Sequence, residues 1–401
     1  MKPQNAAFET FPVSKNVAQM KMSTTLKAGQ TAANLREQGF DVINLTLGEP
    51  DFPTPEFIKE YAWEGLQKNL TKYTPTAGLK TFQESIAEFY AEEFGAHFSP
   101  KEIIATDGGK QALFNAACTL LNPGDEVLIP KPYWVTFPEI IKFTGAKSVY
   151  IETEETDFIL SAEQVRNSIR NRTKLLIINS PNNPTGRVVP PDEMRRIVEV
   201  CAEKNVYVLT DECYLFFAYP PAEVFTSAAL PEELRKFVCV AGSFSKTYAM
   251  TGWRIGYTIA CDEWTNQMTK LQSHSTSHPT SFVQYACARA MHNHAGSKAA
   301  VNLMLAEYKQ RKDWLIPALQ SIEGFKCAMP EGAFYAFVDV RGLLGDKFKT
   351  SADVADILLK EAQTVVTDGE DFGASGFLRI SYATTLENLQ NAVERIRKVL
   401  K

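Results

Sequence analysis

The chain has 401 residues and a formal net charge of −5; 45% of its residues are hydrophobic and 22% are charged. This composition is that of a globular protein, so it excludes an intrinsically disordered chain and disfavours nucleic acid or an anionic membrane as partners. Because one hydrophobic core rarely organises so long a chain, we expect two domains.

The N-terminal segment, residues 1–22, lacks the apolar stretch of a signal peptide, and no apolar run has the length of a membrane-spanning helix. The cysteines are odd in number, seven, and are scattered among apolar neighbours. This pattern is typical of buried thiols in a reducing compartment and not of a disulfide framework. We therefore expect a cytoplasmic protein.

Short β-branched runs alternate with longer amphipathic stretches through the middle of the chain, which indicates βα units on a mostly parallel sheet. Seven strands are expected, at residues 103–106, 126–129, 148–151, 175–179, 206–210, 237–240 and 256–260. Apolar residues spaced as on one face of a helix predict a helix over 113–121, directly after the first strand. A long helix over about 300–322 leads to a tail with the order strand, helix, strand, helix at 334–340, 352–362, 378–381 and 386–400.

Polar residues follow the earlier strands. Gly108, Gly109 and Lys110 begin the first expected helix, where free amides and the helix dipole favour an anion. Trp134 either stacks on an aromatic ligand or belongs to the core. Asn183 lies in a loop of turn-forming residues after the 175–179 strand, and it is either a turn residue or an amide that meets a ring oxygen of a ligand.

Asp211 follows the 206–210 strand, at the edge where α/β sheets bind ligands. Its carboxylate either keeps the ring nitrogen of a pyridine-type cofactor protonated or caps the next helix. Tyr214 either donates a hydrogen bond to a cofactor or packs half-buried. Arg379 lies in an apolar, strand-like run, where either a structural salt bridge or a substrate carboxylate would satisfy its charge.

Lys246 has Ser243 and Ser245 before it and Arg254 eight residues after it. An isolated lysine is more often a surface residue. In this setting, however, the amine can condense with an aldehyde while the hydroxyls and the guanidinium hold a dianionic phosphate. The segment therefore predicts pyridoxal phosphate (PLP) attached to Lys246. We expect no metal site, because the loosely paired histidines at 292 and 294 point to different faces of a helix.

Several motifs occur in one order along the chain: Gly-Glu-Pro-Asp-Phe from residue 48, Asn-Asn-Pro-Thr-Gly from 182, Asp-Glu-x-Tyr from 211, Ser-x-Ser-Lys from 243, Gly-Trp-Arg-x-Gly-Tyr from 252 and Arg-x-Ser-Tyr-Ala from 379. This set resembles the class I aminotransferases of PLP fold type I, and more closely their bacterial aspartate and aspartate–prephenate subgroup, from about residue 13 to the C-terminus. The resemblance implies an α/β fold with a large domain of residues 48–305 around a seven-stranded sheet. It also implies a small α+β domain of residues 1–47 and 306–401, and a homodimer with shared active sites.

The resemblance implies the role of each matching residue. Lys246 would bind the cofactor and transfer a proton, and Asp211 would pair with the ring nitrogen. Tyr214 and Asn183 would contact the ring oxygen, and Trp134 would stack on the ring. The phosphate would be surrounded by Gly108, Gly109, Lys110, Ser243, Ser245 and Arg254, with Tyr73 reaching the phosphate of the neighbouring subunit.

For the substrate, the resemblance implies that Arg379 holds the α-carboxylate, assisted by Gly48, Trp134 and Asn183. Lys110 would meet the distal carboxylate of aspartate or glutamate, and Lys21 resembles a lysine of members that accept prephenate. We expect a ping-pong transfer from aspartate to 2-oxoglutarate, which gives oxaloacetate and glutamate. The alternatives are transfer from prephenate or aromatic substrates and, further away, a PLP-dependent β-lyase.

The sequence departs from the family's usual pattern at two places. Cys213 replaces the usual isoleucine, and we expect it to face away from the chemistry. The segment from His274 to His278 has histidines where relatives often have Gln or Thr, and we expect it to line the pocket. A PLP-binding regulator would carry a DNA-binding domain first, whereas the 47 residues before Gly48 lack a basic recognition helix.

Overall fold

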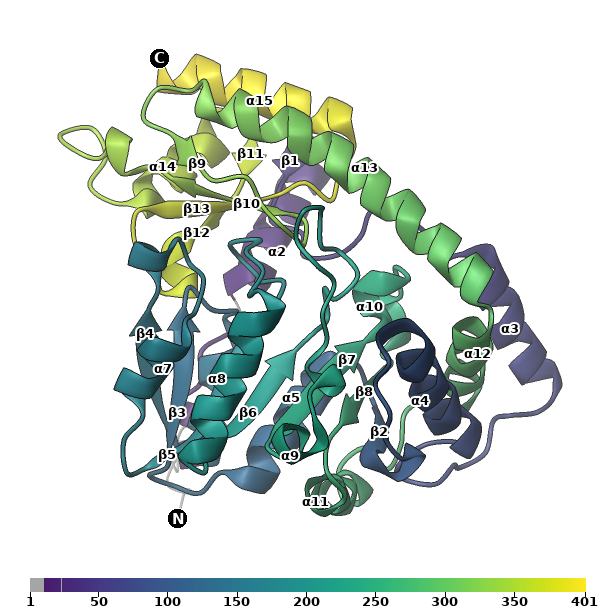
Figure 1. The fold of residues 1–401 in the computed structure, drawn as a ribbon. Helices are drawn as coiled ribbons and strands as arrows, with labels where there is room; N and C mark the ends of the chain where they lie inside the picture. Colours follow the sequence, from purple (N-terminus) through teal and green to yellow (C-terminus); the bar gives the residue numbers. More distant parts are fainter. Residues whose placement is uncertain (1–10, 23) are drawn as a thin grey trace, which may run out of the picture.

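The structure is a computed structural model that describes residues 11–22 and 24–401. Its centre is a seven-stranded sheet with the strand order β2-β8-β7-β6-β5-β3-β4 (Figure 1). The strands are β2 (Ile103–Thr106), β3 (Glu126–Lys131), β4 (Lys147–Glu152), β5 (Thr173–Asn179), β6 (Tyr207–Asp211), β7 (Val238–Ser243) and β8 (Gly256–Ile259). Only β8 runs antiparallel to its neighbours in this sheet. The mostly parallel seven-stranded sheet expected from the sequence is confirmed.

Helices cover both faces of this sheet, and consecutive strand residues enter different cores. In β5, Leu176 and Ile178 pack into one apolar cluster, and Leu175 and Ile177 pack into another. The first cluster includes residues of α3 (Glu56–Gln67), α4 (Lys80–Phe94), α7 (Ala162–Ser168), α8 (Pro191–Glu203) and α12 (Ser281–His292). The second includes residues of α5 (Gly109–Leu120), α6 (Thr136–Thr144) and α11 (Asp262–Ser273). Burial on both faces explains the continuous apolar runs that made these strands visible in the sequence.

The C-terminal part forms a second sheet with the strand order β12-β13-β10-β9. Its elements are β9 (Lys326–Cys327), β10 (Tyr335–Asp339), α14 (Ser351–Lys360), β12 (Thr367–Asp368), β13 (Phe377–Ser381) and α15 (Leu386–Leu400). The order strand, helix, strand, helix agrees with the sequence prediction, whereas the strands of only two residues were missed because they are too short to show a period.

A strand near the N-terminus pairs with a strand of the C-terminal part. Near the N-terminus lie α1 (Lys15–Ala18), α2 (Thr24–Glu37) and β1 (Ile43–Asn44), and β1 pairs in parallel with β11 (Thr364–Val365). The long helix α13 (His294–Gln320) runs past both sheets, from the neighbourhood of α12 to that of α15 (Figure 1). Two short helices complete the set, α9 (Glu232–Arg235) and α10 (Phe244–Thr247). Within the described residues, no helix is both long and apolar enough to cross a bilayer.

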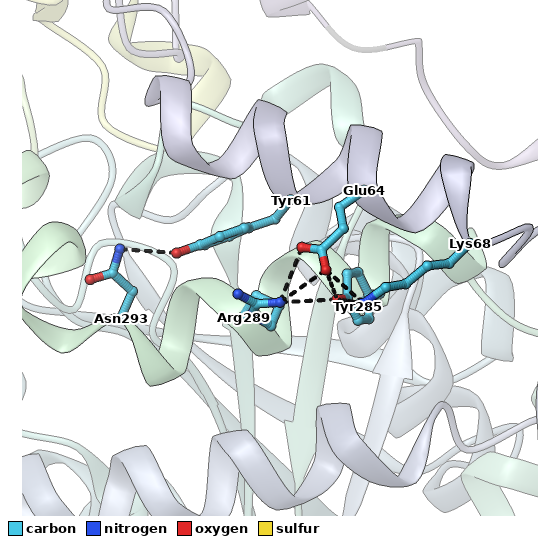
Figure 2. Close-up of polar contacts among 6 residues, drawn as sticks. All are labelled: Tyr61, Glu64, Lys68, Tyr285, Arg289 and Asn293. Atoms are coloured by element: carbon cyan, nitrogen blue, oxygen red, sulfur yellow. Dashed lines mark hydrogen bonds and ion pairs between the residues drawn. The ribbon is translucent and has the colours of Figure 1, made fainter.

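A charged cluster joins α3 to α12 on the surface (Figure 2). The Glu64 carboxylate accepts hydrogen bonds from Lys68 Nζ at 2.6 Å, Tyr285 Oη at 2.9 Å and Arg289 Nη1 at 3.0 Å. Beside it the helices approach closely, because a Cβ on Gly65 would lie 3.2 Å from Tyr285 Cδ1. The hydrogen bonds from Lys68 and Tyr285, together with the charge of Arg289, lower the pKa of Glu64.

We predict that Glu64→Gln lowers the urea midpoint of unfolding at neutral pH. A carboxylate with a depressed pKa stabilises the folded state when it is ionised, and this contribution is lost as the pH falls through the folded-state pKa. The difference between the variant and the parent should therefore shrink at acid pH. Glu60→Gln, on an exposed position of the same helix, is the control, and an equal loss for Glu64→Gln at both pH values would contradict the prediction.

Candidate active site

Three neighbouring parallel strands bring the polar residues of the site to one edge of the sheet. Asn179 of β5 lies opposite Asp211 of β6, and Asp211 lies opposite Ala241 of β7. Helix α10, which carries Lys246, follows β7 directly. The carboxyl ends of such strands are where α/β sheets bind their ligands.

Asp211 is almost fully buried, and its Oδ1 accepts the N–H of Cys213 at 3.1 Å. The residues after it form a turn and not a helix, so the helix-cap alternative is wrong. Burial raises the pKa of Asp211 to about 6, while Cys213 and the charge of Lys246 oppose the rise. A carboxylate held in this way is suited to a cationic partner, such as a protonated ring nitrogen.

Lys246 is half-buried beside Asp211. Burial lowers the pKa of its amine, and the charge of Arg254 lowers it further, against the opposing effects of Cys213, Glu49 and Asp211. A lysine with a lowered pKa is available as a nucleophile and as a base. Burial raises the pKa of the Cys213 thiol well above its usual value, the charge of Asp211 raises it further, and Lys246 lowers it.

A cradle for an anion lies at the start of α5. Gly108 has φ +80°, and a Cβ there would come within 2.6 Å of Arg254 Nη2. A Cβ on Gly109 would lie 3.3 Å from the Cβ of Ser243, whose Oγ accepts the N–H of Ser245 at 3.1 Å. The two hydrogen bonds that Arg254 donates go to the backbone carbonyls of residues 251 and 107. Amides, hydroxyls and a guanidinium therefore converge on one small space, which suits a phosphate.

Arg379 of β13 is 1% exposed. Its Nη1 donates to Asn183 Oδ1 at 2.9 Å, and its Nη2 donates to the carbonyl of Thr46 at 2.7 Å and to Thr367 Oγ1 at 3.4 Å. All three acceptors are neutral, and Nε has no hydrogen-bond partner within the described residues. A buried guanidinium with a free donor is suited to bind a carboxylate bidentately.

A tyrosine that the sequence did not single out lies between these groups. Tyr335 of β10 packs its ring 4.6 Å from the guanidinium of Arg379, and its Oη lies 2.6 Å from Oη of Tyr214. A Cβ on Gly48 would lie 3.0 Å from Tyr335 Oη, so a side chain at position 48 would crowd this hydroxyl. Tyr214 is buried, and its hydroxyl points toward that of Tyr335. An aromatic residue inside an apolar strand gives no sequence signal that separates it from the core.

The remaining predicted residues lie further out. Trp134 is half-buried, and Lys110 places its Nζ 5.0 Å from the centre of the indole ring. Tyr73 is 91% exposed, with its ring edge against His278. Lys21 is also exposed, and its backbone N–H donates to Glu139 of α6 at 2.7 Å. The structure thus gathers most of the predicted site and leaves Tyr73 and Lys21 on the surface.

Comparisons with known proteins agree with this geometry. The family model "Aminotransferase class I and II" matches residues 41–396. The chain belongs to this family. An aspartate aminotransferase of Bacillus sp. YM-2 is 40% identical, with 97% of this chain and 99% of the relative covered. An aspartate/prephenate aminotransferase of Thermus thermophilus is also 40% identical, over 97% of this chain and 98% of the relative.

Solved structures lead to the same family. The aspartate aminotransferase of Thermus thermophilus with maleate superimposes with a TM-score of 0.92 at 39% identity, over 97% of this chain and all of that one. The enzyme of Rhizobium meliloti gives 0.93 at 35% identity, over 98% and 99% of the two chains. The chain is therefore an aminotransferase that depends on PLP. Its residues fit that cofactor, since a guanidinium and a hydroxyl lie close to Gly108 and Gly109, and a buried carboxylate and an amine lie beside each other.

We predict that Asp211→Asn stabilises the protein without its cofactor. The pKa of Asp211 is raised to about 6 in the folded protein. Ionisation of its carboxyl therefore lowers the free energy of unfolding as the pH rises from the unfolded-state pKa through about 6. At pH values above about 6, the free energy of unfolding of the variant should exceed that of the parent by about 3 kcal/mol at most, and the difference should vanish at acid pH. Urea unfolding of the cofactor-free variant and parent at several pH values measures it, and a destabilised variant at pH 8 would contradict the prediction. The same substitution should weaken PLP binding.

Proposed function

We propose that this aminotransferase transfers the amino group of aspartate to 2-oxoglutarate, which gives oxaloacetate and glutamate. The observation that carries the proposal is that two separate cationic side chains, Arg379 and Lys110 beside Trp134, have no ion pair within the described residues. Arg379 offers a buried, free Nε, and Lys110 offers an exposed ammonium that takes part in no ion pair within the described residues. Two cations suit a dicarboxylic substrate, and the Thermus thermophilus structure holds maleate, which is also a dicarboxylate.

Each residue of the site has a proposed task. Arg379 holds the α-carboxylate of the substrate, and Asn183 fixes the guanidinium through the bond between Nη1 and Oδ1. Gly48 and Trp134 would line the position of the substrate α-carboxylate. Holding the substrate in one orientation lowers the barrier by removing rotational freedom before the reaction begins.

When PLP is bound, it supplies an electrophilic carbonyl and an electron-withdrawing ring for the exchange of the amino group. Lys246 is the covalent attachment point, and its low-pKa amine removes the proton from the α-carbon of the substrate. Asp211 would keep a proton on the ring nitrogen, and the hydroxyl of Tyr214 and the amide of Asn183 would hydrogen-bond the ring oxygen. Trp134 would contribute an aromatic surface for the ring.

The phosphate group is held where the free amides of α5 meet Arg254. The proposed ligands are Gly108, Gly109, Lys110, Ser243, Ser245 and Arg254. Tyr73 does not join them within its own subunit, because its side chain is 91% exposed. We assign it to the phosphate of a second copy, which makes the enzyme a homodimer with shared active sites. Other large apolar side chains stand exposed near this loop, among them Trp63 at 61% and Leu66 at 37%.

The division into domains and the location in the cell are part of the proposal. The pairing of β1 with β11 supports a small domain of residues 1–47 and 306–401, with the large domain at residues 48–305. The seven cysteines are free thiols, which supports the cytoplasm.

The test of the reaction is a panel of amino donors and oxo acids. We predict that aspartate and glutamate are consumed only when an oxo acid is present, because transfer requires an acceptor. Release of pyruvate and ammonia without an acceptor would indicate a β-lyase instead. Lys246→Ala should abolish transfer, and turnover by this variant would refute the lysine assignment.

Lys110 and Lys21 separate the substrate classes. With PLP kept saturating, so that a weaker phosphate contact does not limit the rate, we predict that Lys110→Ala raises KM for aspartate by about tenfold or more. KM for aromatic amino acids should change little, because the lost charge-assisted hydrogen bond to the distal carboxylate contributes about 1.5–3 kcal/mol. Lys21→Ala is the comparison variant. If Lys21→Ala loses activity with prephenate alone, the result favours the alternative function, a prephenate aminotransferase, which the names of aspartate/prephenate relatives suggest. An equal rise of KM for all substrates in Lys110→Ala would show that Lys110 does not select the substrate.

A further inference from the structure

The loop that carries Tyr73 is held by side chains from the end of α11 and the start of α12. Gln272 donates to the carbonyl of Thr76 at 2.9 Å, and Ser281 donates to the carbonyl of Leu70 at 2.6 Å. Gln284 accepts the N–H of residue 79 at 2.7 Å. Residues 70–79 are therefore fixed at several points, although the ring of Tyr73 projects into solvent.

His278 is the contact nearest to Tyr73. Its Nε2 accepts the backbone N–H of Thr74 at 3.3 Å, and its ring meets the ring of Tyr73 edge to face, with centres 5.6 Å apart. Its Nδ1 lies 2.8 Å from the carbonyl of Pro279. A carbonyl accepts only, so Nδ1 carries the proton and Nε2 is free to accept. Both ring nitrogens are therefore used, and the imidazole has one orientation.

The same segment contacts the anion cradle. Gln111 of α5 accepts the N–H of Asp107 through Oε1 at 2.6 Å and donates through Nε2 to Thr276 Oγ1 at 2.5 Å. Thr276 also hydrogen-bonds the Asp107 side chain, and the charge of Arg254 acts on Asp107. The turn before Gly108 and the Tyr73 loop are thus held by one short stretch of chain, residues 276–278.

We propose that His278 is a positioning residue for Tyr73, and that residues 276–278 couple the phosphate cradle of one subunit to the tyrosine that it presents to the other. This inference rests on the proposed role of Tyr73 at a second copy. It assigns to the histidine segment a role in cofactor binding across the dimer and not in the choice of substrate side chain.

The experiment is a double-mutant cycle on the PLP dissociation constant of the dimer, with Tyr73→Phe, His278→Ala and the two combined. We expect each single variant to raise the constant by about five- to tenfold, the effect of one lost hydrogen bond, and the double variant to raise it no further. His278→Gln keeps an acceptor for the Thr74 N–H and should retain most of the affinity. His274→Ala is the matched control, since His274 is an exposed histidine of the same segment.

Each outcome decides between the claims. If Tyr73→Phe leaves PLP affinity unchanged, the proposed role of Tyr73 fails and the inference falls with it. If Tyr73→Phe weakens binding but His278→Ala does not, or if the two effects simply add, only the role of His278 is overturned. Thermal unfolding of each variant shows whether it is folded, and a His278→Gln variant as weak as His278→Ala would also contradict the positioning role.

Discussion

The register of three parallel strands determines where the site forms. Because β5 and β6 end opposite each other and β7 continues to Ser243, Asn179, Asp211 and the turn into α10 reach one edge of the sheet. Lys246 and Asp211 then lie close enough for each to shift the pKa of the other. A slip of one residue in either pairing would turn Asp211 to the opposite face of the sheet, away from its present neighbours. The chemistry therefore depends on strand pairing before it depends on any single side chain.

Arg379 joins this edge to the rest of the molecule. Its guanidinium contacts Asn183 after β5, Thr46 near the N-terminus and Thr367 of β12, so three distant stretches of chain meet at one buried charge. Burying a charge costs free energy unless it is paired, and here the hydrogen bonds go to neutral oxygens. The site thus retains a cation that a substrate carboxylate can neutralise. The guanidinium that we propose for the substrate carboxylate therefore also links three segments of the chain.

Much of the fold and the site could be predicted from the sequence. The buried strands appear as apolar runs, and Lys246, Asp211, Asn183 and Arg379 stand at their ends or inside them in a specific order. Tyr335 could not be found, because its role comes from cross-strand neighbours and its residue type suits a core. The surroundings of Cys213 depend on the tight turn in which Asp211 accepts the Cys213 N–H, a local geometry that no motif in the sequence predicts.

The central claim is that the strand ends place PLP on Lys246. Borohydride reduction of the purified holoenzyme, followed by digestion and mass spectrometry of the peptides, tests this claim without reference to substrate. The account predicts one stable phosphopyridoxyl group per chain, on the peptide that contains Lys246. A label on Lys110 or another lysine, or a holoenzyme that loses all of its cofactor after reduction, would contradict it.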